Sequence, residues 1–245
     1  MNLDPKPICF FLLILLIWEV ATGFFAEALF PGPYRVLEAL VETVQNGELV
    51  SDLFSSSFRL MAGIVLGCFA GMIVGFLMGS FPALDRTISP LLHILKALPP
   101  VALIPFMIVW FGIADLSKVL SIAFAVFFPV WLSTISGITD ISPDYLRVAS
   151  LFSKSPLQTF YKVTFPAALP FVVSGIRIGI GMGFIMVFVS ELAGASSGLG
   201  YFIANSQITY RIDRMMAGLT VLGLLAASSD FIFLQTIKRI CPWVE

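Results

Sequence analysis

DISPDYLRVASLFSKSPLQTFYKVTFPAALP, residues 140–170, is a polar insert in a sequence that otherwise reads almost continuously as membrane. Ser142 stands where it can cap a helix whose first position is Pro143, and Asp144 adds negative charge at the positive end of the helix dipole. A second start follows at Ser155, with a glutamine three residues later as a capping box. The insert is therefore predicted to form two short helices rather than a flexible linker.

The composition identifies an integral membrane protein. Hydrophobic residues make up 58% of the chain and charged residues only 12%, whereas about a quarter of residues in soluble domains are charged. The formal net charge of -1 and the lack of a basic run give no footprint for a nucleic acid. The cysteines Cys9, Cys68 and Cys241 lie far apart and are interpreted as inert buried thiols, without a disulfide framework or a metal site.

Long apolar runs predict an all-α, polytopic protein with about six transmembrane helices in a single domain of residues 1–245. A signal peptide is the alternative for the first run, but its apolar character continues to residue 30, which is long enough to span a bilayer. The expected spans are 8–30, 60–79, a third that ends near 113, 119–138, a fifth that starts near 168, and 215–236.

The segments between the spans carry most of the charge. Residues 31–52 combine acidic residues with apolar ones at helical spacing, which is typical of an amphipathic helix outside the membrane. Short turns are expected at Asp85 and Arg86 on the inside and at residues 115–118 on the outside. Residues 193–211 are expected to form an external loop or re-entrant segment.

Basic residues are modestly biased toward one side of the membrane, which favours cytoplasmic termini and a cytoplasmic insert. The inner set is Lys6, Arg86, Arg147, Lys154, Lys162, Lys238 and Arg239, and the outer set is Arg35, Arg59, Lys118, Arg211 and Arg214.

Two spans carry a glycine at every fourth residue, at positions 63, 67, 71, 75 and 79 and again at 175, 179 and 183. In lipid, such a stripe lets another backbone approach closely. For the second span this indicates either tight packing within one subunit or a border with a second subunit or a moving pore. The third span is interrupted at Pro99 and Pro100 and again at Pro105. Because broken helices occur at membrane depth where they line a cavity or are buried in protein, this span is a candidate for lining the pore.

Charged residues also lie inside the fifth span. Arg177 and Glu191 are fourteen residues apart, which places them about 40° apart around a helix and about 21 Å apart along it. Charges within a span usually face the bundle interior or a wet path. Arg177 is therefore interpreted either as a member of a structural ion pair, with Asp230 or Glu19, or as a residue that passes or repels an anion.

The polar insert resembles the cytoplasmic "EAA" loop of the membrane-spanning subunit of ATP-binding-cassette importers. That loop has Glu-Ala-Ala, a glycine a few residues later and then Leu-Pro. Here Arg147-Val148-Ala149 stands at the Glu-Ala-Ala place, Ser153 at the glycine and Leu169-Pro170 at the Leu-Pro, so Arg147, Val148 and Ser153 depart from the pattern. PAALP, SSGLGY at 196–201 and KALPPVALIPFMIVWFGIADLSKV at 96–119 make the chain similar to the nitrate, taurine, sulfonate and bicarbonate branch.

The resemblance implies a type I importer permease fold and a cytoplasmic coupling loop, residues 140–165. It also implies the partners: cytoplasmic ABC ATPase subunits that bind ATP and Mg²⁺, a second permease copy, a periplasmic or lipid-anchored binding protein, and the lipid of the bacterial inner membrane. The solute would be a small one, most often an anion. The implied contacts with the ATPase are Tyr145, Leu146, Arg147, Val148, Ala149, Leu151 and Ser153, and the candidate pathway residues are Pro99, Pro100, Arg177 and Glu191.

The sequence contains no pattern that supports an enzyme. GxxxxGK[ST] is absent, so this chain is not expected to cradle ATP phosphates, and a lone His93 is more typical of a structural residue than of a base or a ligand. A self-contained channel or ion-coupled carrier is the alternative to the importer. That class usually shows intramembrane acid or histidine relays or an inverted repeat, and the polar insert favours the importer.

Overall fold

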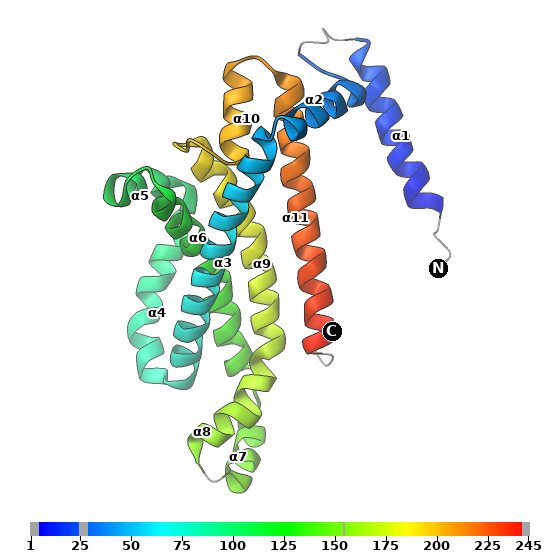
Figure 1. Ribbon diagram of the computed structural model, residues 1–245. Helices are drawn as coiled ribbons and strands as arrows, with labels where there is room; N and C mark the ends of the chain where they lie inside the picture. The colour runs from blue at the N-terminus through cyan, green and yellow to red at the C-terminus, as the bar shows by residue number, and fades with distance from the viewer. Residues whose placement is uncertain (1–4, 25–28, 154, 242–245) are drawn as a thin grey trace. The chain divides into compact units, whose positions relative to one another are not determined.

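The computed structural model describes residues 5–24, 29–153 and 155–241, and this part of the chain contains helices and no strand (Figure 1). The predicted all-α class is confirmed. The helices are α1 (Pro5–Thr22), α2 (Pro33–Gln45), α3 (Glu48–Ser80), α4 (Pro82–Ala97), the 3₁₀ turn η1 (Pro100–Leu103), α5 (Ile104–Phe111), α6 (Asp115–Thr139), α7 (Pro143–Phe152), α8 (Pro156–Thr159), the π turn η2 (Phe160–Thr164), α9 (Phe165–Leu192), α10 (Leu199–Ile208) and α11 (Ile212–Ile240).

The described chain has four helices that are long and apolar enough to cross a membrane, or five if the bent pair α4 and α5 forms one span. The four are Glu48–Ser80, Asp115–Thr139, Pro156–Leu192 and Ile212–Arg239. The apolar stretch Leu12–Thr22 of α1 is shorter. Within the described residues, α1 ends at Thr22, before the predicted end of the first span at residue 30, and four or five spans are seen where about six were predicted.

The chain groups into two compact units, Met1–Ser56 with Ala195–Leu224, and Ser57–Gly194 with Leu225–Glu245. In the first unit, α2 packs on the start of α11 through Val36, Ala39 and Ala217. Residues 31–52 were predicted as one amphipathic helix, but the structure ends α2 at Gln45 and turns at Gly47 with a φ of 80°. Glycine adopts this left-handed conformation without steric cost, so α3 begins at Glu48, twelve residues before the predicted start of the second span.

In the second unit, α6 packs against both α3 and α9. The glycine stripe of α3 faces α6, as do Gly175 and Gly179 of α9, whereas Gly183 faces Leu60 and Ile64 of α3. A Cβ added at Gly67 would lie 2.6 Å from the carbonyl oxygen of Ala123 on α6, and one at Gly71 would lie 2.8 Å from that of Phe127. On the other side of α6, a Cβ at Gly175 would lie 2.9 Å from the carbonyl oxygen of Pro129. The stripe of the second span is thus used for packing within one subunit. The glycine face of α3 is therefore covered by α6 of the same chain.

Several predicted turns lie instead within helices. Asp85 and Arg86 belong to the first turns of α4, Asp115 starts α6, and Lys118 is buried on α6 at 3% exposure. Residues 193–211 contain the helix α10. Lys154, which was counted among the inner basic residues, lies outside the described residues.

Candidate functional site: the α7 loop and the charged groups of the spans

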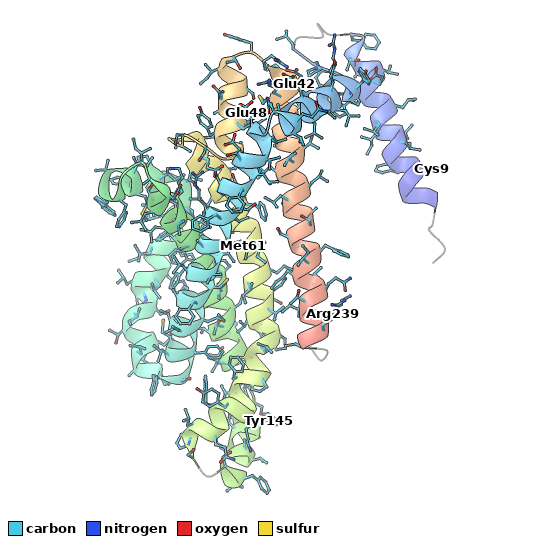
Figure 2. All side chains as sticks on the ribbon, in the orientation of Figure 1. Cys9, Glu42, Glu48, Met61, Tyr145 and Arg239 are labelled. Atoms are coloured by element: carbon cyan, nitrogen blue, oxygen red, sulfur yellow. The ribbon has the colours of Figure 1, made fainter. Side chains whose placement is uncertain are left out.

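The helix α7 presents an apolar surface outside the spans. Tyr145, Val148, Leu151 and Phe152 are exposed at 59%, 53%, 82% and 83%. Figure 2 shows Tyr145 on this helix, beyond the end of α9. Leu157 on α8 and Tyr161 on η2 extend the exposed apolar set at 64% and 63%. Phe152, Leu157 and Tyr161 were not predicted as contact residues, although large apolar residues within a polar insert are a usable signal.

The local structure of the insert follows its helix signals only in part. Pro143 is the first residue of α7, as predicted, but the Ser142 side chain makes no capping hydrogen bond. Arg147 pairs with Asp144 within the same helix at 3.1 Å, with both side chains more than 80% exposed. At the second start, Ser155 Oγ accepts a hydrogen bond from the backbone N–H of Gln158 at 3.3 Å, which confirms that cap.

The second helix of the insert is continuous with the fifth span. One helix of 37 residues, Pro156–Leu192, runs through α8, η2 and α9. The helix that carries the fifth span therefore begins twelve residues before the predicted start of that span near residue 168. The π turn of η2 lies immediately before Pro166, where a proline lacks the N–H that a regular helix would use. The insert thus connects directly to a membrane span.

A cavity of about 990 Å³ lies between the insert and the ends of α3 and α6. Leu146 of α7 and Ser153 line it from the insert. From the other side it is lined by Phe76 near the end of α3, Phe81 just after α3, and Ile138 near the end of α6. Of the predicted coupling residues, Leu146 and Ser153 therefore face the body of the chain. Arg147, Val148 and Leu151 face outward. Tyr145 is 59% exposed and also lines a second pocket with Gly137 of α6 and Phe171 of α9.

Arg177 of α9 forms an ion pair with Asp230 of α11. Its Nε donates to one carboxylate oxygen and its Nη2 to the other, both at 2.8 Å. The predicted structural partner Asp230 is confirmed, and Glu19 is not the partner. The two side chains remain 51% and 39% exposed.

Glu191 lies in a cluster of charges that is buried at Arg59 and Glu191 and exposed at Asp115, whose side chain is 57% exposed. Arg59 of α3 donates to Glu191 at 2.8 Å and to Asp115 of α6 at 2.7 Å, and the Arg59 and Glu191 side chains are 6% and 0% exposed. Removing one partner of such a buried pair costs about 3–5 kcal/mol. Lys118 donates to the carbonyl oxygens of Ile113 and Ala114. Arg59 was predicted to be one of the basic residues on the outer side, and its pairing with Glu191 and Asp115 was not predicted.

The break at Pro99 and Pro100 bends the third span sharply. The helices on either side, α4 and the segment Pro100–Phe111, meet at 88°. The predicted interruption is confirmed. Together the two arms are long and apolar enough for one broken span or a re-entrant loop.

In the first unit, buried acceptors hold the start of α10. Asp52 Oδ1 accepts from the backbone N–H of Gly198 and Ser56 Oγ from that of Leu199, both at 2.7 Å. These two groups satisfy donors that a helix start leaves free. The glycine-rich motif at 196–201 is therefore fixed against the first turns of α3.

Also in the first unit, Glu42 of α2 bridges two arginines, Arg214 at 2.7 Å and Arg211 at 3.3 Å. Figure 2 labels Glu42 and Glu48, which lie on α2 and at the start of α3. The hydrogen bond and the charge of Arg214, with a smaller contribution from Arg211, lower the pKa of the Glu42 carboxyl below its ordinary value.

No group of three His, Cys, Asp or Glu residues suited to a metal ion occurs in the described ranges. The ring of His93 packs edge-on against Trp131 at a centroid distance of 5.4 Å. Of the cysteines, Cys68 and Cys241 are buried, whereas Cys9 is exposed, so the interpretation of all of them as buried thiols was wrong for Cys9.

Comparison with known proteins gives the family. The model described as "binding-protein-dependent transport system inner membrane component" matches residues 63–242. The chain is 31% identical over 232 residues to the putative aliphatic sulfonates transport permease protein SsuC of Bacillus subtilis, with 94% of this chain and 84% of that protein covered. It is also 31% identical over 232 residues to the taurine transport system permease protein TauC of Escherichia coli, with 92% and 84% covered.

A solved structure supports the fold. A chain of the MetNI methionine ABC transporter in an inward-facing conformation superposes with a TM-score of 0.68 at 19% identity, covering 80% of this chain and 97% of that one. Nothing in these matches favours a self-contained channel or an ion-coupled carrier. The chain belongs to the binding-protein-dependent transport system inner membrane component family, and it is a multi-pass permease subunit of an ABC importer.

Proposed function

We propose that two copies of this chain form the translocation pathway of an ATP-driven importer for a small organosulfonate anion of the taurine class. The relatives named for aliphatic sulfonates and taurine align over 94% and 92% of this chain. For this reason we prefer the sulfonate class to nitrate and bicarbonate. A periplasmic or lipid-anchored binding protein would deliver the solute, and both termini would lie on the cytoplasmic side of a bacterial inner membrane.

The ATPase contact rests on the exposed apolar surface of α7. Apolar side chains at 53–83% exposure on a helix outside the spans are typical of contact with another protein. In the proposed complex, Tyr145, Val148 and Leu151 insert into a groove of a cytoplasmic ATPase. Arg147, whose exposed pair with Asp144 contributes little, exchanges that partner for acid on the ATPase. ATP and Mg²⁺ bind to the ATPase and not to this chain.

The remaining residues of the loop support that surface from behind. Leu146 and Ser153 line the cavity against the ends of α3 and α6, and Ala149 is half-buried. They would set the position of α7 on the chain, while the outward side chains contact the partner. Within the membrane, the break at Pro99 and Pro100 and the exposed Arg177 are assigned to the pathway. Glu191 would act there by fixing α9 through Arg59.

The test is copurification of the ATPase with the tagged chain from native membranes in mild detergent. Leu151→Asp places a charge in the proposed contact and should abolish copurification and uptake while the chain stays in the membrane. Ser142→Asp is the matched control, because it adds the same charge to the same loop at a helix start that favours acid. Retained ATPase and full uptake in Leu151→Asp would refute the contact.

A further inference from the structure

The ion pair of Arg177 and Asp230 lies deep within two spans. Arg177 is twelve residues after the start of α9 and Asp230 is ten residues before the end of α11, which correspond to about 18 Å and about 15 Å of helix. The hydrocarbon core of a bilayer is about 30 Å thick. Both charges therefore lie at a depth where lipid offers them no polar group.

The pair is nevertheless open to its surroundings. Its side chains are 51% and 39% exposed, whereas those of the Arg59 and Glu191 pair in the same unit are 6% and 0% exposed. Exposure of a charge to lipid is strongly unfavourable, and intramembrane charges face the bundle interior or a water-filled cavity. The exposed side of this pair must contact water or a polar partner.

The hydrogen bonding of Arg177 indicates water. A guanidinium has five N–H donors, and within the described part of the chain the Asp230 carboxylate is the only acceptor that the side chain contacts. Ser174 and Gly181, three residues before and four after Arg177, share its face of α9. Both are exposed, and a Cβ added at Gly181 would meet open space. Ile178 and Ile185 are also exposed near this face, at 58% and 53%. The surface around the ion pair is therefore mixed in polarity, and the open space at Gly181 leaves room for water beside Arg177.

We infer that the Arg177 and Asp230 pair borders the aqueous path of the transporter and that Arg177 is a transient contact for the anionic group of the transported solute. The solute class rests on the proposed function. The guanidinium can hold two oxygens of a sulfonate through parallel N–H donors, as it does for other planar or branched anions. The N–H donors of Arg177 that do not bind Asp230 engage the anion, while Asp230 keeps its hold on the remaining donors.

The carboxylate of Asp230 explains how such a contact can remain transient. A path must attract the solute enough to admit it and release it readily afterward. An unpaired arginine beside the path would attract an anion with its full positive charge. With Asp230 already bound by two hydrogen bonds, an arriving anion meets a neutral pair and departs when Asp230 resumes its place.

The first test measures water at this face without any solute. In a background with the three native cysteines replaced, Ser174→Cys should react with a membrane-impermeant methanethiosulfonate reagent in vesicles opened on both sides. Phe69→Cys is the matched control, since Phe69 is 62% exposed on α3 among apolar neighbours. A thiol in an apolar medium forms less thiolate, so its rate should be at least about tenfold lower. Equal low rates, or cross-linking of two Ser174→Cys chains without labelling, would overturn the inference.

The second test separates an anion contact from a structural pair. Arg177→Gln combined with Asp230→Asn keeps polar side chains at both positions and removes both charges. We expect the assembled variant to retain ATP hydrolysis stimulated by the binding protein, while taurine uptake falls at least about tenfold, as for the loss of a charge-assisted contact. Normal uptake in this double variant would overturn the anion contact. If the unmodified chain takes up no taurine, the proposed solute fails, and the labelling result still decides whether the face is wet.

Discussion

Gly67→Ala is expected to separate two helices that touch through their backbones. A Cβ at this position would lie 2.6 Å from the carbonyl oxygen of Ala123 and 2.7 Å from Cβ of Val126. Carbon atoms in good contact are about 3.5–4.0 Å apart, so α3 must retreat from α6 by about 1 Å. Both obstructing atoms belong to backbone or to a side chain fixed at Cβ, and no rotamer change relieves the overlap.

The expected loss of stability is about 1–3 kcal/mol, the range for overpacking a well-packed interior. The upper part of this range is expected because moving α3 also loosens its contacts at the other glycines of the stripe. Gly181→Ala is the matched control: it makes the same change within a span, but its Cβ meets nothing within 4 Å. Its stability should stay within about 1 kcal/mol of the parent, in line with the helix propensities of the two residues.

The assay is reversible unfolding of purified chain in mixed micelles as SDS is added, followed by tryptophan fluorescence. A double variant, Gly67→Ala with Gly75→Ala, sharpens the test. One displacement of α3 relieves both overlaps. The double variant should therefore lose less stability than the sum of the losses of the two single variants. Equal stability of Gly67→Ala and Gly181→Ala would refute the close packing, and strictly additive losses would refute the displacement of a whole helix.

Two further predictions concern charges. Glu191→Ala leaves Arg59 buried and without its innermost partner, which should destabilise the fold by about 3–5 kcal/mol. Size-exclusion chromatography of a fluorescent fusion should then show loss of the monodisperse protein. A normal profile would argue against the buried pair of Arg59 and Glu191. The lowered pKa of Glu42 means that its pairs with Arg214 and Arg211 stabilise the protein above the ordinary value of 4.5 and lose this effect as pH falls toward the native pKa. The protection of α2 amides against hydrogen exchange, measured relative to the intrinsic exchange rate at each pH, should therefore fall below about pH 4.5, and Glu42→Gln should lower this protection at neutral pH as well.

Patterns with a short repeat could be interpreted from the sequence. The glycine stripe identified close packing because its period of four matches one face of a helix, and the serine at 155 identified a helix start because capping is local. The break at Pro99 and Pro100 was equally clear, since proline acts on its own backbone. In each case the cause lies within a few residues of its effect.

Features that depend on distant partners could not be predicted in this way. Asp52, Ser56 and Arg59 look like surface residues, and this led to a late start for the second span. Asp52 and Ser56 are buried because they hold the start of α10, and Arg59 because Glu191, 132 residues away, neutralises it. The insert presented the opposite problem: it was predicted as a polar segment ending before a fifth span that starts near residue 168, whereas one helix runs from Pro156 to Leu192 through the π turn of η2.

The close contacts of α6 with α3 and α9 have a mechanical consequence. At Gly67, Gly71 and Gly175 a Cβ would lie 2.6–2.9 Å from backbone oxygens of α6, so little room for sliding separates these helices, and we expect them to move together. The loop carrying α7 leaves from the end of α6 and returns to α8, which is continuous with α9. Because both ends of the loop are attached to this group of helices, we expect a displacement of α7 to act on α6 and α9 at the same time.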